Sequence, residues 1–442
     1  MLREQTSAAE TNTAVIEELN YDGRGVARVG GKVVFIDDAL PGEQVLFRYI
    51  RKRKSYDTGR LVEILSASSH RVTNPECPYF GTCGGCVLQH MQPDAQIAAK
   101  EQVVRDSLAH IGKVQAEQWL PPLQGPVWGY RRKARLGVRL VPKKGGVLIG
   151  FHERRRSFIT PLADCKTLDS RFARLLPALR NVIEALSCPH RIPQIEVAAG
   201  DSEAALVFRH LDPLTSADVA RLREFAELSG VHILLQPGAH ESVQPLWPQE
   251  LRLLTYRLPE HAVQIFFSAT DFVQVNAVVN RQMVTRALEL LDPQPNEQVL
   301  DLFCGVGNFT LPLARRASRV IGIEGNRALL ERAQHNAAHN ALRNTEFRPA
   351  DLTDKVSAQP WGESRFAKLL LDPPRSGAIE VIKRLPPNGP TRIVYVSCYP
   401  ATLARDSEYL VYALGYRLAQ ACVMDMFPHT SHAESMALFV RP

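Results

Sequence analysis

The chain has 442 residues, which is enough for two to four domains with cores of their own. Hydrophobic residues make up 45% and charged residues 22% of it, as in ordinary globular proteins. The first twenty residues contain no apolar segment of the kind found in signal peptides. No apolar run approaches the roughly 18 residues of a membrane span. We therefore expect a cytoplasmic protein without a membrane partner, whose eight cysteines are reduced, metal-bound or catalytic.

The net charge of +7 is concentrated in two places rather than spread along the chain. Residues 131–156 hold ten lysines and arginines against one acid, Glu153, and a smaller basic cluster runs from Arg48 to Lys54. Patches this dense indicate a polyanionic partner, because lysine and arginine contacts to phosphate provide salt-dependent affinity. For the smaller cluster, a solvated basic face is an equally good interpretation.

Short apolar runs separated by turn residues fill the beginning of the chain. Val33–Ile36 and Val45–Phe47 are separated by Pro41-Gly42, and a further run covers Leu61–Leu65. About five strands in roughly fifty residues predict a small closed β-barrel of the OB type. This segment, residues 1–68, resembles a TRAM domain, which is a small RNA-binding barrel.

A glycine-rich loop with three cysteines follows, Cys77, Cys83 and Cys86, in the spacing C-x5-C-x2-C. Thiolates suit zinc or an iron–sulfur cluster, and zinc modules usually repeat the shorter C-x2-C unit. We therefore favour a [4Fe-4S] cluster over zinc and over free thiols. A fourth ligand is needed, for which Cys165 is the first candidate and Cys188 the second.

The segment 69–262 is predicted to be an α+β domain that carries the larger basic patch and the cysteine loop. Apolar spacing predicts a helix over residues 94–111, and Gly145-Gly146 marks the turn of a hairpin. A second helix is expected over residues 170–186. We expect this domain to hold RNA through its phosphates.

Strands and helices alternate in the last segment, residues 263–442. A helix over 276–291 precedes the strand Gln298–Phe303, a glycine turn at Cys304–Asn308 and another helix. Further strands are expected at Arg319–Ile323, 368–371 and 393–396. This alternation predicts a Rossmann-like, doubly wound parallel sheet, with ligands at the carboxyl ends of its strands.

The glycine turn bears on the choice of cofactor. It lacks the third glycine of the G-x-G-x-x-G motif, which argues against NAD. An acid at the strand end, Asp301, and an open glycine backbone suit S-adenosylmethionine, which has a charged amino acid end and no phosphate. Glu324, after the next strand, can bond ribose hydroxyls, and Asp351 can reach the adenine edge. Cys304 is interpreted as a small packing residue.

Cys398 follows an apolar strand and stands before Pro400, so it lies where strand gives way to loop. Carbon 5 of uracil attacks a methyl sulfonium poorly unless a thiolate has added to carbon 6. A base must then remove the proton from carbon 5. Cys398 can be this nucleophile, Glu434 the base, and Asp372 the group that holds the uracil edge.

Each of these residues also has a plainer interpretation. A cysteine at a strand end is usually a small buried hydrophobe, and Asp372 can merely cap a helix. His429, His432 and Glu434 can also be read as a metal triad, although no further ligand is visible. The joint occurrence of nucleophile, base and edge-holding acid favours the catalytic interpretation.

The motifs FVQVN, DLFCGVGNF, IEGN, DPPR, SCYPATLARD and HTSHAES together resemble the RNA uracil-C5 methyltransferase family. With the barrel and the four cysteines, nearly the whole chain resembles the RlmD (RumA) branch, which methylates uridine 1939 of 23S ribosomal RNA. The resemblance implies nucleophile Cys398 and base Glu434. It implies the cluster ligands Cys77, Cys83, Cys86 and Cys165. It implies S-adenosylmethionine contacts at Gln274, Phe303, Asn308, Glu324, Asp351 and Asp372.

The chain departs from the family at Tyr399, where asparagine commonly follows the nucleophile, so the packing around the thiol is left open. The transfer-RNA branch is similar in its catalytic domain but is expected to lack the barrel and the cysteines. A DNA cytosine methyltransferase carries Pro-Cys, so no DNA partner is expected, and a radical enzyme would need C-x3-C-x2-C. An RNA-binding protein with a decayed catalytic domain would be expected to have lost Cys398, Glu434 or the Gly305/Gly307 turn. We expect a monomer.

Overall fold

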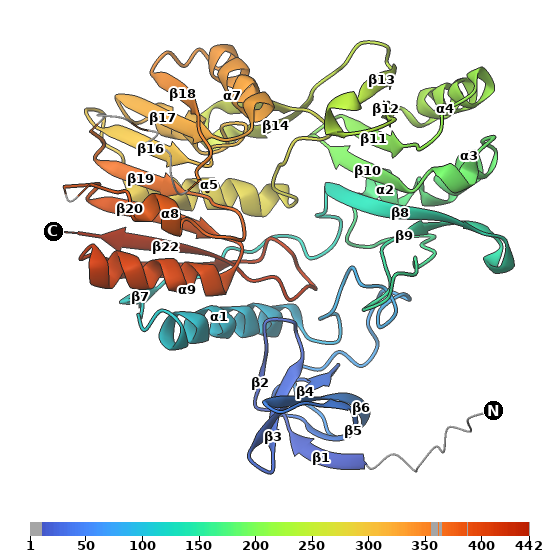
Figure 1. The fold of residues 1–442 in the computed structure, drawn as a ribbon, viewed down its shortest axis with the longest axis horizontal. Coiled ribbons are helices and arrows are strands. Elements are labelled where there is room, and N and C mark those ends of the chain that lie inside the picture. The colour runs from blue at the N-terminus through green and yellow to red at the C-terminus, as the bar shows by residue number, and fades with distance from the viewer. Residues whose placement is uncertain (1–10, 355–360, 362–364, 387, 442) are drawn as a thin grey trace.

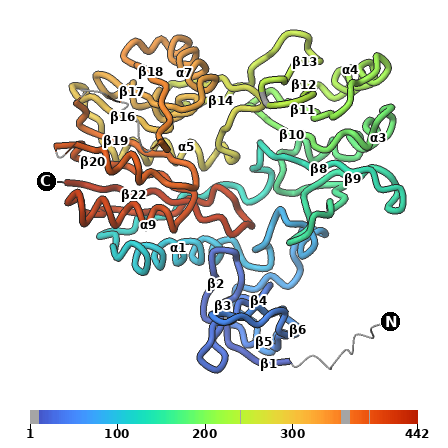
Figure 2. The backbone as a smooth tube through the Cα atoms, viewed as in Figure 1, coloured from blue at the N-terminus to red at the C-terminus, as the bar shows by residue number. Residues whose placement is uncertain are grey.

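The computed structural model describes residues 11–354, 361, 365–386 and 388–441. Three bodies are visible in Figure 1: a small barrel, a central sheet with helices on one side, and a large sheet. The tube in Figure 2 shows that α9 (Pro400–Glu408), near the end of the chain, returns to lie beside the early helix α1 (Pro93–His110). No helix in the described ranges is both long enough and apolar enough to cross a bilayer.

The barrel has the predicted short strands, and from residue 11 onward there are six of them rather than about five. Alternating side chains, among them Val34, Ile36, Val45 and Phe47, fill its interior. The order in the sheet is β1-β5-β6-β4-β3-β2. The strands are β1 (Thr11–Val15), β2 (Glu18–Leu19), β3 (Gly25–Val29), β4 (Lys32–Asp37), β5 (Gln44–Lys52) and β6 (Tyr56–Ser66).

The central sheet has the order β13-β12-β11-β10-β8-β9. The predicted hairpin is confirmed as the antiparallel pair β8–β9, but the helix expected over 170–186 is broken in two. Pro177 lies in the first turn of the second helix, where proline is tolerated, and not in a helix interior. The elements are β8 (Lys133–Val141), β9 (Gly146–Gly150), α2 (Ser170–Ala173), α3 (Leu176–Glu184), β10 (Gln194–Ala199), β11 (Ala204–Arg209), α4 (Ser216–Ser229), β12 (His232–Gln236) and β13 (Gln244–Trp247), with short 3-10 turns at Pro142–Lys144, Pro189–Arg191 and His240–Ser242.

The large sheet confirms the Rossmann-like prediction. Strands β18, β17, β16, β19 and β20 are parallel neighbours in that order, with α5, α6 and α7 on one face and α8 and α9 on the other. These elements are α5 (Ala277–Leu291), β16 (Gln298–Leu302), α6 (Thr310–Ala314), β17 (Arg319–Glu324), α7 (Arg327–His339), β18 (Thr345–Pro349), β19 (Lys368–Leu371), α8 (Ile379–Ile382), β20 (Arg392–Ser397) and α9 (Pro400–Glu408), which continues as a π-helical turn (Tyr409–Ala413).

The other edge of this sheet differs from a purely parallel arrangement. β22 (Glu434–Val440) runs antiparallel to β20, β21 (Arg417–Met424) follows it, and β7 (Gln118–Trp119) closes the edge. Helix α1 joins α8 and α9 over the same face, where Val104 and Leu108 are buried. Two elements from the predicted central segment therefore pack with the last domain.

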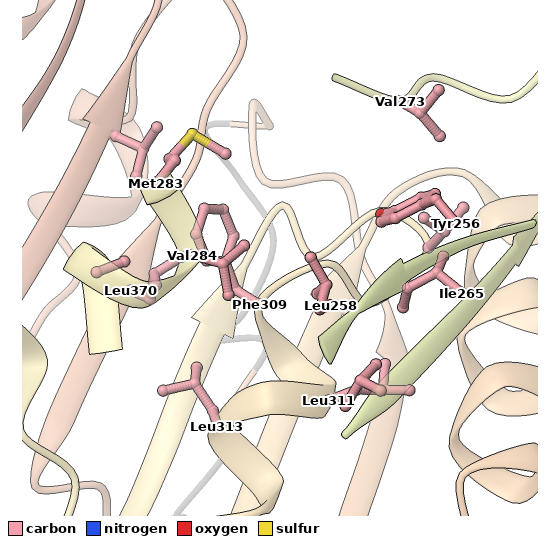
Figure 3. Packing of buried hydrophobic residues seen from close by; sticks show 14 of the residues in the cluster. Tyr256, Leu258, Ile265, Val273, Met283, Val284, Phe309, Leu311, Leu313 and Leu370 are labelled. Carbon is pink, nitrogen blue, oxygen red and sulfur yellow. The ribbon is translucent and has the colours of Figure 1, made fainter. Parts of the chain in front are cut away.

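The hairpin of β14 (Leu254–Leu258) and β15 (Val263–Phe267) also links the two segments. The boundary predicted at residue 262 falls inside it, next to a 3-10 turn at Pro259–His261. Figure 3 shows Tyr256 and Ile265 of this hairpin in one apolar cluster with Phe309 and Leu311. The hairpin thus supports the glycine turn of the large sheet.

The barrel is fixed to the rest of the molecule by apolar and charged contacts. Leu19 and Leu40 of the barrel share a buried cluster with Leu88, Met91 and Ala95. Arg71 donates to the buried carboxylate of Glu43, with 2.8 Å between Nη2 and Oε2, and Arg154 lies 2.5 Å from Asp38. These contacts hold the β2–β3 turn beside the end of the large sheet that carries Cys398.

Candidate active site

A pocket of about 490 Å³ opens at the carboxyl ends of the parallel strands. It brings together most of the predicted site residues, namely Gln274, Phe303, Asn308, Glu324, Asp372, Cys398 and Glu434. Asp351 is not part of its lining. That side chain is exposed after β18 and accepts bonds from the backbone N (2.8 Å) and hydroxyl (2.6 Å) of Thr353.

The turn after β16 needs its glycines. Gly305 and Gly307 have φ of 54° and 94°, and a Cβ on Gly307 would lie 2.0 Å from Leu311. Phe303 also has a positive φ, 65°, which is unusual for a bulky side chain and marks a constrained backbone at the site. The backbone N of Gly305 donates to Glu324 Oε2 over 3.1 Å, so Glu324 is oriented by the turn itself.

Asn308 is oriented by residues that sequence analysis missed. Its Oδ1 accepts bonds from the Tyr256 hydroxyl (2.8 Å) and from Asn280 Nδ2 (3.1 Å), and its Nδ2 donates to Asn280 Oδ1 (2.9 Å). Asp301 was expected to face the cofactor but is fully buried behind the turn, where it accepts a bond from the Thr310 hydroxyl. Burial raises the pKa of Asp301 to about 8.

Cys398, Asp372 and Glu434 come from three neighbouring strands. Cys398 follows β20, Asp372 follows β19, and Glu434 begins β22. Because Ser397 pairs with Ser435 in the antiparallel ladder, Cys398 and Glu434 stand next to each other across it. The pairing of the antiparallel strand β22 with β20 therefore places Glu434 beside Cys398.

The ionisable side chains of this pocket are shifted by their surroundings. Burial, followed by the charge of Asp372, raises the pKa of Glu434 to about 8, while Lys100 and Arg375 act in the opposite direction. Burial raises the pKa of Asp372 to about 7. Burial and the two carboxylates raise the pKa of Cys398 to about 11, opposed by Arg375. Carboxyl groups shifted toward neutral pH, as Asp372 and Glu434 are, are typical of catalytic sites, whereas the raised pKa of Cys398 keeps its thiol protonated at neutral pH.

The loop before Glu434 is held by the early part of the chain. Lys100 of α1 donates to Asp425 Oδ1 over 2.6 Å and to the Phe427 carbonyl over 3.0 Å, and both charged side chains are buried. Trp128 stacks on His429, with 4.0 Å between ring centroids. In the described part of the chain no group of His, Cys, Asp and Glu is arranged for a single metal ion, so the metal triad gains no support.

The four predicted cluster ligands, Cys77, Cys83, Cys86 and Cys165, line one small cavity of about 20 Å³. Burial raises the pKa of Cys86 to about 12, and the other three cysteines add to this. A Cβ on Gly84 would lie 2.8 Å from the His152 carbonyl, so the loop wraps tightly. The alternative ligand, Cys188, is not among the residues that line the cavity.

Four side chains of the large basic patch make contacts within the protein, while others, such as Arg135 and Arg156, are exposed. Arg132 and Lys133 are mostly buried, and they donate to the Gln274 carbonyl (3.1 Å) and to the Ala269 carbonyl (3.1 Å) respectively. Arg154 and Arg155 form ion pairs with Asp38 and Asp37 of the barrel. Part of the patch therefore joins domains instead of facing solvent. The sequence signal for these ion pairs is the pair of adjacent acids at the end of β4, Asp37 and Asp38, which sequence analysis did not connect with the basic patch.

Comparison with known proteins gives consistent results. The family described as tRNA (Uracil-5-)-methyltransferase matches residues 254–441, and the TRAM domain matches residues 9–48. A 23S rRNA (uracil(1939)-C(5))-methyltransferase RlmD from Alcanivorax borkumensis is 51% identical over 99% of each chain. Its namesake from Alkalilimnicola ehrlichii is 52% identical over 96% of each chain.

Among solved structures, the tRNA (uracil-54, C5)-methyltransferase of Pyrococcus abyssi in complex with S-adenosyl-L-homocysteine has a similar fold. The match has a TM-score of 0.73 and 24% identity, and covers 97% of this chain and 100% of that one. Because a transfer-RNA enzyme matches almost the whole chain, overall architecture alone does not separate the two RNA substrates, contrary to the expectation above. The full-length identities do separate the branches, and they show that this chain belongs to the RlmD family of RNA uracil-C5 methyltransferases.

Proposed function

We propose that the protein transfers a methyl group from S-adenosylmethionine to carbon 5 of uridine 1939 in 23S ribosomal RNA. The observation that carries this proposal is the juxtaposition of Cys398 and Glu434 in the pocket that the glycine turn and Glu324 also line. In the sheet, β16 and β19 lie between β17, which ends at Glu324, and β20, which precedes Cys398. The full-length relatives named for this reaction support the choice of RNA.

The chemistry follows from three side chains. The Cys398 thiolate adds to carbon 6 of the uracil, which concentrates electron density on carbon 5. S-adenosylmethionine, when bound, would supply the electrophilic methyl group: carbon 5 would form the new bond to the methyl carbon, and the S–CH3 bond would break to leave S-adenosylhomocysteine as a neutral thioether. Glu434 then takes the proton from carbon 5, and the thiolate leaves carbon 6 with its electron pair. Asp372, whose pKa of about 7 allows either protonation state, holds the polar edge of the base.

The cofactor is assigned to the side of the pocket opposite the catalytic pair. Glu324 has lone pairs left to accept bonds from ribose hydroxyls, although it already accepts from Gly305 and Asn326. Gln274, Phe303 and Asn308 line the same region. Asp372 lines the same pocket, and we assign it a contact with S-adenosylmethionine as well as with the uracil. Asp351 lies outside the pocket lining, and we assign it a contact with the adenine of the cofactor.

The cysteine cavity is proposed to hold a [4Fe-4S] cluster. Four thiols around one cavity form the donor set of such a cluster, which takes one thiolate at each iron. Because those thiolates bind different irons, they need not converge on one point. The spacing C-x5-C-x2-C, which lacks the repeated C-x2-C unit of zinc modules, favours this cluster over zinc. Bound there, it would tie residues 77–86 to Cys165 beside the basic region.

A second cavity, of about 540 Å³, is proposed to receive RNA next to the catalytic pocket. The barrel, the cysteine loop, the central domain and the loop after β21 all contribute to it, and Arg24, Arg131 and His432 are in its lining. Arginines there would bind phosphates, and the uridine would be splayed from its loop to reach Cys398.

The experiment uses two RNAs and labelled S-adenosylmethionine. Unmodified 23S RNA is expected to gain label at one uridine, and Cys398→Ala is expected to abolish it. Transfer RNA is the second candidate, because the fold is shared with the Pyrococcus abyssi enzyme. Label in transfer RNA alone would support the proposed methyl transfer but show that the substrate is transfer RNA. Label in neither RNA would refute the proposal.

A further inference from the structure

The turn between β2 and β3 is a rigid part of the barrel. The side chain of Asn20 accepts bonds from the backbone N of Asp22 (3.0 Å) and of Arg24 (2.9 Å). Gly23, with φ of 74°, fits so closely that a Cβ there would lie 3.2 Å from both Leu88 and Ser431. The turn thus packs between Leu88, which follows the cysteine loop, and Ser431, in the loop that leads to Glu434.

Tyr21 projects from this turn to the nucleophile's own loop. Its ring meets the ring of Tyr399 edge to face, with 5.0 Å between centroids and 82° between planes. Its hydroxyl is buried and has no hydrogen-bond partner within the part of the chain that the structure describes. Arg375 and Cys398 lie near enough for their charges to act on this hydroxyl.

Tyr399 in turn determines the backbone around Cys398. Its backbone N donates to the Ser397 hydroxyl over 3.2 Å, and its carbonyl accepts a bond from the same hydroxyl over 3.2 Å. The Tyr399 carbonyl also accepts the backbone N of Leu403, in α9. Cys398 is therefore bracketed by two mutually bonded neighbours, and a movement of Tyr399 would move the thiol.

We propose that the barrel completes the catalytic site, with Tyr21 as a positioning residue that clamps Tyr399 and so fixes the direction of the Cys398 thiol. This rests on the proposed methyl transfer. It also accounts for the tyrosine at position 399, since a smaller side chain there would leave the Tyr21 ring without its partner. The barrel then has a role in the chemical step as well as in holding RNA.

The test measures the nucleophile directly, in full-length protein carrying Glu434→Gln so that the RNA–protein adduct accumulates. Tyr21→Leu is expected to slow adduct formation at saturating RNA about tenfold, because small displacements of a reacting atom are costly. Tyr399→Leu should do the same, and the double variant should be no slower than either. Tyr21→Phe, which keeps the ring, should stay within about twofold of the parent.

Tyr56→Leu is the matched control, because Tyr56 is a barrel aromatic that packs on Phe35. It should raise the RNA concentration needed for half-maximal rate and leave the saturated rate alone. If Tyr21→Leu behaved like Tyr56→Leu, with the saturated rate retained, the positioning role would be overturned while the proposed function stood. Absence of any adduct in the Glu434→Gln parent would instead count against the proposed function. Melting curves check that each variant is folded.

Discussion

At the scale of single residues, the site is built from acids that the fold keeps largely protonated. Glu434 is 7% exposed and lies beside Asp372, so its carboxylate is disfavoured until the pH approaches about 8. A base with a pKa near the working pH can both take a proton and release it again. The same burial that would suit Glu434 to its proposed role as a base makes its ionised form a source of instability.

Glu434→Gln should separate the two halves of the reaction. Glutamine cannot accept the proton from carbon 5, so the methylated uracil should stay bonded to Cys398 and turnover should fall at least about hundredfold. The measurement is a shifted RNA–protein band on a denaturing gel. Cys398→Ala in the same background should remove that band. Repeated turnovers by Glu434→Gln would show that another group is the base.

The same substitution should stabilise the protein at alkaline pH. The folded state raises the pKa of Glu434 from its ordinary 4.5 to about 8, so it retains a proton that the unfolded chain releases. Stability from this group is therefore fully present below pH 4.5 and is lost as the pH rises toward 8. Glu434→Gln should melt at least about 2 °C above the parent at pH 8.5 and by less at pH 5.5. An equal difference at both pH values would contradict this.

At the scale of elements, local patterns were predictable and long-range contacts were not. The strand, glycine turn and helix from Gln298 follow from neighbouring residues, and the structure has them in place. Helix α1 was also predicted, but nothing in its apolar spacing says that it packs beneath β21 and beside the loop that carries Glu434. Tyr256, Tyr21 and Lys100 were missed for this reason, since each acts on residues far away in the chain.

The contact between α1 and the catalytic loop leads to a prediction for Lys100. Lys100→Met would leave the buried Asp425 without its partner, which should cost about 3 kcal/mol or more. It would also remove a positive charge that lowers the pKa of Glu434, so the pH–rate profile should shift to higher pH. The double variant Lys100→Met/Asp425→Leu should regain most of the lost folding stability, because no unpaired charge is left buried, and its pH–rate profile should stay shifted to higher pH. An unchanged profile in the stable double variant would contradict the coupling.

At the scale of the whole molecule, the cysteine cavity lies where several parts of the chain meet. Gly85 and Phe151 line both this cavity and the larger one proposed for RNA. The TRAM barrel and the Rossmann-like sheet were foreseeable from composition and motifs. The contacts between the parts were not foreseeable. Arg154 and Arg155, which the sequence suggested would bind RNA, form ion pairs with the barrel instead.

Loss of one of the proposed cluster ligands should therefore affect folding and RNA binding together. Cys165→Ser should remove the visible absorption expected of an iron–sulfur protein, lower the melting temperature, and weaken RNA binding about tenfold or more. Cys188→Ser is the matched control, because that cysteine lies outside the cavity lining, and it should behave as the parent does. Normal solubility and RNA affinity in Cys165→Ser would argue against the assignment.

The pairing of β7 with β21 has a consequence for how the protein is made. Gln118 and Gln420 are neighbours across that edge although 302 residues separate them. At about 5 to 20 residues per second, a ribosome needs about 15 to 60 s to synthesise the chain between them. During that interval the nascent chain exposes the apolar side of α1 and an unpaired strand edge. Nascent chains shorter than about 420 residues should therefore depend on chaperones, and should be far more sensitive to protease than the finished enzyme.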